Sequence, residues 1–237
     1  MRSGWVVVVL ALAACGDDGT NTSPRDANTP IDVAPDVPAC MPTGTPQTVY
    51  LNFTGATYSE SSVEDSVANT SNVLDMQRTL AAWPHSNTAA IKACITTRLA
   101  GFNLDIVDVD PGTVAHHEIV FSTTYWDQAN VPSISAIGCG TPNPKSVTFL
   151  FGVSVGTDPV AACEYAVLQF ATSSTGLDHS LDCHDYLGNS QTACGAKTFV
   201  DMDIQCGEFQ ARLCTCTGSQ TQNSFQRMQM VHGSRCP

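Results

Sequence analysis

Positive charge is scarce in this 237-residue sequence, which has 10 Lys and Arg residues against 22 Asp and Glu residues and a net charge of −12. A chain this acidic is not expected to bind nucleic acid, or to be held on anionic lipid by electrostatic attraction. Long hydrophobic runs are also missing: the apolar segment of residues 5–14 is about half of the roughly 20 residues that a membrane-spanning helix needs. The sequence has no G-x-S-x-G nucleophile motif and no internal repeat.

Residues 1–14 have the features of a secretory signal peptide, with a basic start at Arg2, a short apolar segment and small residues before Cys15. The sequence Leu12-Ala13-Ala14-Cys15 resembles the lipobox of bacterial lipoproteins, in which the chain is cut before the cysteine and the cysteine carries acyl chains such as palmitate. The resemblance implies an exported, extracytoplasmic protein whose membrane partner is reached through lipid on Cys15. Gly16 resembles the residue found in lipoproteins sent to the outer membrane, so we expect that membrane rather than the inner one. The alternative is an ordinary signal peptide followed by an accidental cysteine.

The sequence contains eleven cysteines, an odd number. If Cys15 carries lipid, ten remain, and an even number in an exported chain predicts up to five disulfides. The ten candidates are Cys40, Cys94, Cys139, Cys163, Cys183, Cys194, Cys206, Cys214, Cys216 and Cys236. A zinc cluster of Cys206, Cys214 and Cys216 is the alternative, although this spacing matches no structural zinc site well. Gly138-Cys139-Gly140 predicts a tight turn that bears a disulfide.

The composition divides the chain into three parts. Residues 1–14 are the predicted signal peptide. Residues 15–46 are rich in Asp, Thr, Asn, Pro and Gly and cannot bury enough apolar surface to fold, so they predict a lipidated, disordered tether with a reach of roughly 30 Å. Residues 47–237 are expected to form one globular domain.

Alternating apolar residues predict strands at 48–53, 105–110, 118–123 and 146–151. Helical spacing predicts helices at 88–100, 158–174 and 223–231, the second one with Val160, Val167, Phe170 and Ala171 on its buried side. Asp158-Pro159 is a favourable start for that helix, and Gly176 is a natural end. Residues 57–85 give no clear pattern. This order predicts an α/β (α+β) fold with a mixed twisted sheet, packed helices and a loop-rich, disulfide-rich C-terminal part.

The helix that ends before Gly176, followed by Gly176-Leu177-Asp178-His179, resembles the zinc-binding region of metzincin metallopeptidases. That family carries H-E-x-x-H-x-x-G-x-x-H, in which a glycine turn brings a third histidine back to the two on the helix. Gly176 and His179 match the last two motif positions. The resemblance by order of elements covers about residues 48–233, and it implies a metzincin-like fold.

The remaining motif positions do not match. Gln169 and Ser173 stand where the family has its first two histidines, and Phe170 stands where the glutamate takes a proton from zinc-bound water. Downstream, Asp182-Cys183-His184-Asp185-Tyr186 falls where the family makes a methionine-containing turn, with His184 in place of the methionine. With one histidine left and no general base, we expect no cofactor and little or no peptidase activity.

Other interpretations of these residues stay open. His179 is a packed or surface histidine if the fold is unrelated. Alternatively, His184 supplies a second nitrogen and Asp178 or Glu164 an oxygen, which would give a remodelled zinc site. The pair His116-His117 lies before a strand. Because neighbouring strand side chains point to opposite faces, these two histidines are not expected to bind one metal, and they are expected at a solvated polar edge.

The leading hypothesis is therefore a lipid-anchored pseudopeptidase of the cell envelope that binds a peptide or protein without cleaving it, along a sheet edge beside the old cleft. The second hypothesis is an active zinc metalloendopeptidase with non-standard ligands around His179 and His184. The third is a structural envelope lipoprotein.

Overall fold

The computed structural model describes residues 44–123, 131–188 and 194–235. All of them belong to one compact unit, residues 40–237. The predictions for Cys15, Cys40 and Cys236 fall outside the described residues, as do the predicted signal peptide and nearly all of the predicted tether.

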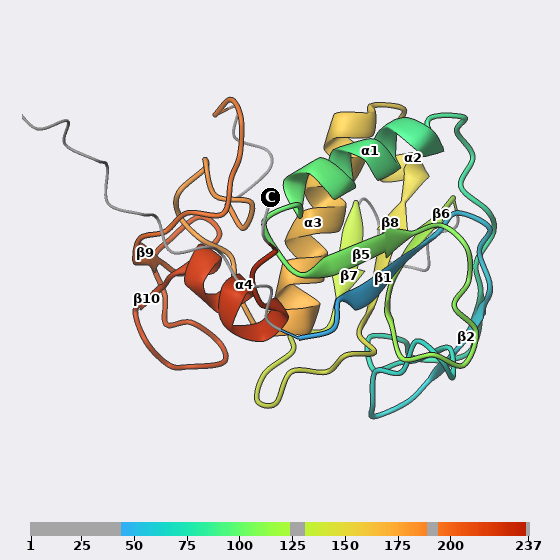
Figure 1. Cartoon of the computed structure of the whole chain (residues 1–237), viewed down its shortest axis with the longest axis horizontal. Coiled ribbons are helices and arrows are strands. Elements are labelled where there is room, and N and C mark those ends of the chain that lie inside the picture. Colours follow the sequence, from blue (N-terminus) through green and yellow to red (C-terminus); the bar gives the residue numbers. More distant parts are fainter. Residues whose placement is uncertain (1–43, 124–130, 189–193, 236–237) are drawn as a thin grey trace, which may run out of the picture. The chain divides into compact units, whose positions relative to one another are not determined.

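A five-stranded mixed sheet, in the order β5-β1-β6-β8-β7, forms the centre of the fold (Figure 1). Its strands are β1 (Gln47–Asn52), β5 (Leu104–Val107), β6 (His117–Ser122), β7 (Ser133–Ser135) and β8 (Val147–Phe151). The first four in spatial order run parallel, and β7 is an antiparallel edge strand paired with β8. Every residue of β6 and β8 is buried, as expected for central strands covered on both faces.

Two helices, α1 (Thr88–Arg98) and α3 (Pro159–Thr175), lie together on one side of this sheet (Figure 1). Ile91 and Ile95 of α1 and Val167 of α3 pack in the same core as Leu51 and Ile119 of the sheet. A disulfide between Cys94 and Cys163 joins the two helices. The short helix α2 (Gly152–Val155) connects β8 to α3.

A small three-stranded sheet precedes α1, in the order β3-β2-β4. It consists of β2 (Thr57–Glu60), β3 (Thr70–Ser71) and β4 (Arg78–Thr79). Tyr58, Leu74 and Leu80 from this segment form a second core with Val120 and Phe149, side chains of the central sheet that alternate with those facing the helices. The segment that gave no clear pattern in the sequence therefore contributes a core of its own.

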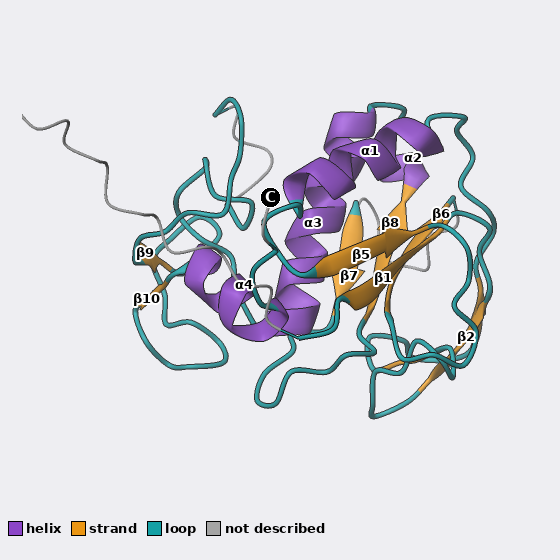
Figure 2. Ribbon diagram, in the orientation of Figure 1, coloured by secondary structure: helices purple, strands orange, loops and turns teal. Residues whose placement is uncertain are grey.

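The chain beyond α3 is mostly loop (Figure 2). Its regular elements among the described residues are the pair β9 (Ile204–Gln205) and β10 (Thr221–Gln222) and the helix α4 (Ser224–His232). Disulfides Cys139–Cys216, Cys183–Cys194 and Cys206–Cys214 hold these loops. None of the described helices is both long enough and apolar enough to cross a membrane.

The mixed α/β class and the disulfide-rich C-terminal part are as predicted, and each predicted helix and strand has a counterpart within a few residues. Three details were wrong. The strand predicted at 105–110 ends at Val107, because its partner β1 pairs only through Tyr50 on that side. Val160 is 48% exposed, since it lies in the first turn of α3. The proposed Cys206–Cys214–Cys216 zinc cluster is excluded, because Cys206 is bonded to Cys214 and Cys216 to Cys139.

Candidate functional site

The helix α3 and the turn that follows it contain the residues of the candidate site. Asp158 caps the helix by accepting a hydrogen bond from the Val160 amide at 2.9 Å, and Pro159 occupies the first turn. The helix ends at Gly176, whose φ of 74° is left-handed, and its amide donates to the Thr172 carbonyl at 3.1 Å. The helix and glycine turn expected from the sequence are therefore present, with His179 three residues beyond the turn.

Phe170, at the position of the glutamate, is part of the hydrophobic core. Its side chain is 1% exposed. The ring lies 5.2 Å from that of His117 in an edge-to-face contact and 5.2 Å from that of His232 in a stacked one. This position of α3 faces the interior of the domain and presents no group to a substrate.

Gln169 and Ser173, at the two helical histidine positions, are bonded to neighbouring strands. Ser135 of β7 donates to the Gln169 side-chain oxygen at 2.7 Å. Ser173 is 3% exposed, and its hydroxyl lies 3.1 Å from that of Thr148 and 3.2 Å from that of Ser146. Both side chains therefore link the helix to the sheet.

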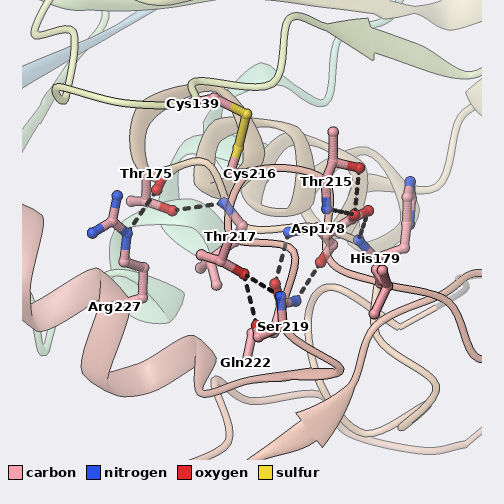
Figure 3. The surroundings of a disulfide bond; sticks show 12 residues. Cys139, Thr175, Asp178, His179, Thr215, Cys216, Thr217, Ser219, Gln222 and Arg227 are labelled. Carbon is pink, nitrogen blue, oxygen red and sulfur yellow. Dashed lines mark hydrogen bonds between the residues drawn. A yellow bond between two sulfur atoms is a disulfide. The ribbon is translucent and has the colours of Figure 1, made fainter.

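Asp178 is a structural ion-pair partner. Its carboxylate accepts two hydrogen bonds from Arg212, and its side chain is 1% exposed. It also accepts two hydrogen bonds from Thr215 and one from the His179 amide (Figure 3). Burial alone would raise the pKa of Asp178, but the bonds from Arg212 and Thr215 lower it to about 2. This carboxylate is ionised and fully used, so it has no oxygen left for a metal ion.

The two candidate imidazoles differ in their surroundings. His179 is half-buried, and its Nδ1 atom is buried with no hydrogen-bond partner in the part of the chain that the structure describes. His184 has a side chain that is 61% exposed, with Nδ1 3.2 Å from a carboxylate oxygen of Asp182. Within residues 44–123, 131–188 and 194–235, a single group of three potential ligands converges within 4.8 Å, namely Asp182, Cys183 and His184.

That group does not resemble a zinc site. Cys183 is bonded to Cys194, so its sulfur is not a thiolate, the form in which cysteine binds zinc. Two weak exposed donors remain, and neither His179, Asp178 nor Glu164 belongs to the group. The described residues therefore do not fit a zinc ion at the position that the metzincin resemblance implies, nor at the remodelled site around His179 and His184.

A loop covers the C-terminal end of α3 (Figure 3). The Gly138 amide donates to the Thr172 carbonyl at 3.1 Å, and a Cβ atom at Gly138 would lie 2.0 Å from the Ser173 carbonyl oxygen. Cys139 joins this loop to Cys216. The predicted disulfide at Cys139 is thus confirmed, and the loop that carries it occupies the space against which Ser173 and Gly176 lie.

The sequence interpretation was wrong about His116 and His117. They are 3% and 2% exposed, and they are not at a solvated edge. The rings of His117 and His232 both lie 3.0 Å from the Gln47 side-chain oxygen, and His117 also bonds Ser146 at 2.8 Å. Because one oxygen faces both rings, each must present an N–H to it. Burial lowers the pKa of His232 to about 3 and lowers that of His117 well below its ordinary value.

Glu118, on the opposite face of β6, was also missed by sequence analysis. Its carboxyl accepts from Tyr58 at 2.8 Å and from Asn52 at 2.9 Å, while its second oxygen is buried without a partner among the described residues. Burial raises the pKa of Glu118 to about 7. A polar residue in the strand pattern was the available signal, but the pattern alone does not show that both faces are covered.

No known protein-family profile matches this chain, and no curated protein is significantly similar to it.

Proposed function

We propose that this protein is a lipid-anchored, extracytoplasmic pseudopeptidase with a metzincin-like domain that binds a peptide or protein segment and does not cleave it. The observation that carries the proposal is the structural use of the motif positions on α3. Phe170 fills the core, Ser173 bonds the sheet, and Gln169 bonds β7. Positions that would need to face a metal and a substrate are committed to packing the domain.

The order of elements supports the resemblance on which this proposal rests. Strand β1 and helix α1 are followed by the strands β5, β6, β7 and β8 and by helix α3, which leads to a glycine turn and then to His179. The central sheet ends in the antiparallel edge strand β7. The exchange of hydrogen bonds between β7 and β8 occupies one side of β7. The other side of β7 has no strand partner among the described residues, and we propose that an extended peptide adds there, because strand addition needs main-chain groups and no catalytic residue.

The disulfides support the proposed location. Four disulfides join cysteines of the described chain, two of them across 69 and 77 residues, and such bonds form and persist in oxidising compartments outside the cytoplasm. Together with the lipobox-like sequence before Cys15, they favour export followed by anchoring. A non-catalytic tethered domain would then act by holding its ligand near the membrane.

The test of catalytic silence uses the full chain produced in an oxidising compartment. We expect no stoichiometric zinc by mass spectrometry and no cleavage of unfolded casein, with S173A as a control that leaves the zinc content unchanged. Stoichiometric zinc that is lost in H179A, together with casein cleavage, would show an active enzyme and overturn the proposal.

The test of anchoring compares the wild type with C15A and with a matched C183A/C194A variant. We expect the wild type in the membrane fraction with a mass increase that corresponds to acyl chains. C15A should lose both the added mass and the membrane association, whereas C183A/C194A should keep them. A wild-type chain without acylation would refute the anchor.

A further inference from the structure

A pocket of about 250 Å³ lies between the C-terminal end of α1 and the loop at residues 197–199, away from the motif positions on α3. Its floor is a group of aromatic rings. Phe102 contacts Phe199 at 5.3 Å and Phe225 at 5.9 Å, and Tyr186 contacts Phe199 at 5.0 Å between ring centroids. The floor is therefore apolar and partly aromatic, and it exposes a small part of these rings, since Phe102 and Tyr186 are 2% exposed and Phe199 is 7% exposed.

The wall of this pocket carries hydrogen-bond donors that the protein does not use. The Arg98 guanidinium lies over the Tyr186 ring at 5.9 Å from its centroid. Among the residues that the structure describes, neither this guanidinium nor the Tyr186 hydroxyl has a hydrogen-bond or ion-pair partner. Arg98 is half-buried, so its charge is only partly hydrated.

Lys197 adds a second cationic group. Its side chain is 5% exposed, and its ammonium donates one hydrogen bond at 2.9 Å to the Gly188 carbonyl. Two carboxylates lie near enough to act electrostatically on the pocket: Glu164 acts on Tyr186 and Lys197, and buried Asp185 acts on Lys197. In the described chain, neither carboxylate forms an ion pair within 4.0 Å with Arg98 or Lys197. Two cationic side chains therefore lie beside the aromatic floor, and neither has an ion-pair partner among the described residues.

We propose that this pocket binds a carboxylate attached to an aromatic or branched apolar group, such as the last residue of a peptide or a small aromatic acid. Arg98 binds the carboxylate, as the planar guanidinium fits that group in a bidentate manner, and the rings of Phe102 and Phe199 contact the apolar part. The volume is below the usual 300 to 1,000 Å³ of drug-sized sites, so it accepts one side chain with its carboxylate. This inference is independent of the proposed pseudopeptidase role.

The experiment titrates the isotopically labelled full chain, in nonionic detergent, with N-acetyl-L-phenylalanine and follows the amide resonances of residues 97–102 and 197–199. We expect saturable shifts with a dissociation constant on the order of 0.1–1 mM, as suits so small a ligand. The uncharged N-acetyl-L-phenylalanine amide should bind at least about tenfold more weakly, because it lacks the charge that Arg98 recognises.

Matched variants separate this site from general partitioning into detergent. R98Q should weaken binding at least about tenfold, while K92Q, which removes the same charge elsewhere on α1, should leave it unchanged. E164Q should bind the anion more tightly, because it removes a nearby negative charge. A far-ultraviolet circular dichroism spectrum equal to that of the wild type ensures that R98Q is folded.

A tripeptide Ala-Ala-Phe with a free carboxyl group identifies the source of the ligand. Binding of both probes indicates a peptide C-terminus, whereas binding of N-acetyl-L-phenylalanine alone indicates a small free acid. Either result supports the site. The proposal is overturned if neither probe gives saturable shifts at these residues, or if R98Q and K92Q bind equally well.

Discussion

Asp178, in the turn after α3, has a structural task. Its buried carboxylate is held by Arg212 and Thr215, and its main chain bonds the side chain of Gln222 in both directions. The turn after α3 is thereby tied to residues 212–222, which come from the disulfide-rich end of the chain. The neighbouring His179 is left without a comparable role, since its buried Nδ1 lacks a partner among the described residues.

We predict that D178N destabilises the domain by about 2–3 kcal/mol at pH 7. Removing one member of a buried ion pair leaves the other uncompensated, but Arg212 is 45% exposed, so solvent screening reduces the usual cost. The pKa of Asp178 is lowered, so its stabilising contribution is present above its ordinary pKa of about 3.8 and is lost as the pH falls toward 2.

Urea unfolding at pH 7 and pH 3 measures this effect, with D182N as the control, because the Asp182 carboxylate contacts only the amide and the ring of exposed His184 among the described residues and has no ion pair with an arginine or lysine there. The difference between D178N and the wild type should shrink at the lower pH. Equal stability of D178N and wild type at pH 7 would contradict the structural role of this carboxylate.

A second prediction concerns whether position 170 can carry a glutamate in place of Phe170. F170L should cost less than F170E, because leucine still fills the apolar space, whereas glutamate would place a carboxylate between the rings of His117 and His232. We expect F170L to fold with a loss of about 1–2 kcal/mol. F170E should fail to accumulate, as judged by yield and thermal unfolding. A folded F170E of wild-type stability would show that this position is open to a site.

At the scale of elements, α3 was predicted well because the residues that start and end a helix act on the neighbouring main chain. Asp158 and Gly176 fix its ends whatever surrounds the helix. The sequence could not predict which faces of a strand are covered, so the burial of His117 and Glu118 was missed. Both faces of β6 are buried by segments more than twenty residues away. The short strands β2, β3 and β4 were missed for the same reason, since pairing stabilises them and periodicity does not.

The candidate site was predictable only as a set of positions. The sequence correctly placed Gly176 at a helix end and showed that Gln169, Phe170 and Ser173 could not serve as ligands and base. It could not show that Arg212 and Thr215 saturate Asp178, because those residues lie 34 and 37 positions away. The pocket beside Arg98 is assembled from four separate segments and left no local pattern.

Two disulfides in exposed loops allow a prediction about stability, because one of them, Cys139–Cys216, holds the loop that covers the C-terminal end of α3. Cys139–Cys216 spans 77 residues and Cys183–Cys194 spans 11. On chain-entropy grounds, C139S/C216S should lose roughly 4.5 kcal/mol and C183S/C194S roughly 3 kcal/mol of stability. Denaturant unfolding of both double variants under non-reducing conditions measures the difference. A larger loss in C183S/C194S would indicate that holding the Cys139 loop over α3 contributes little to stability.

At the scale of the whole molecule, buried groups of opposite type set the dependence of stability on pH. His117 and His232 have lowered pKa values, so their protonation opposes the folded state as the pH falls below about 6.5. Glu118 and Asp185 have pKa values raised to about 7 and about 6, so folding is opposed as the pH rises above their ordinary values of 4.5 and 3.8. Between pH 4.5 and 6, unfolding is therefore accompanied by uptake of protons on His117 and His232 and by release of protons from Glu118 and Asp185.

These opposing changes should partly cancel in that window, with burial of Glu64, which raises its pKa, adding to the carboxyl side, and E118Q should reveal the balance. Without the proton that Glu118 binds in the folded state, the stability of E118Q should rise with pH by about 1.4 kcal/mol per pH unit relative to the wild type. At pH 8, E118Q should exceed the wild type by about 3 kcal/mol, and at pH 4 the two should be similar. Chemical unfolding from pH 4 to 8, with exposed E60Q as the matched control, tests this. Parallel curves for E118Q and wild type would show that Glu118 ionises as freely in the folded protein as in the unfolded chain.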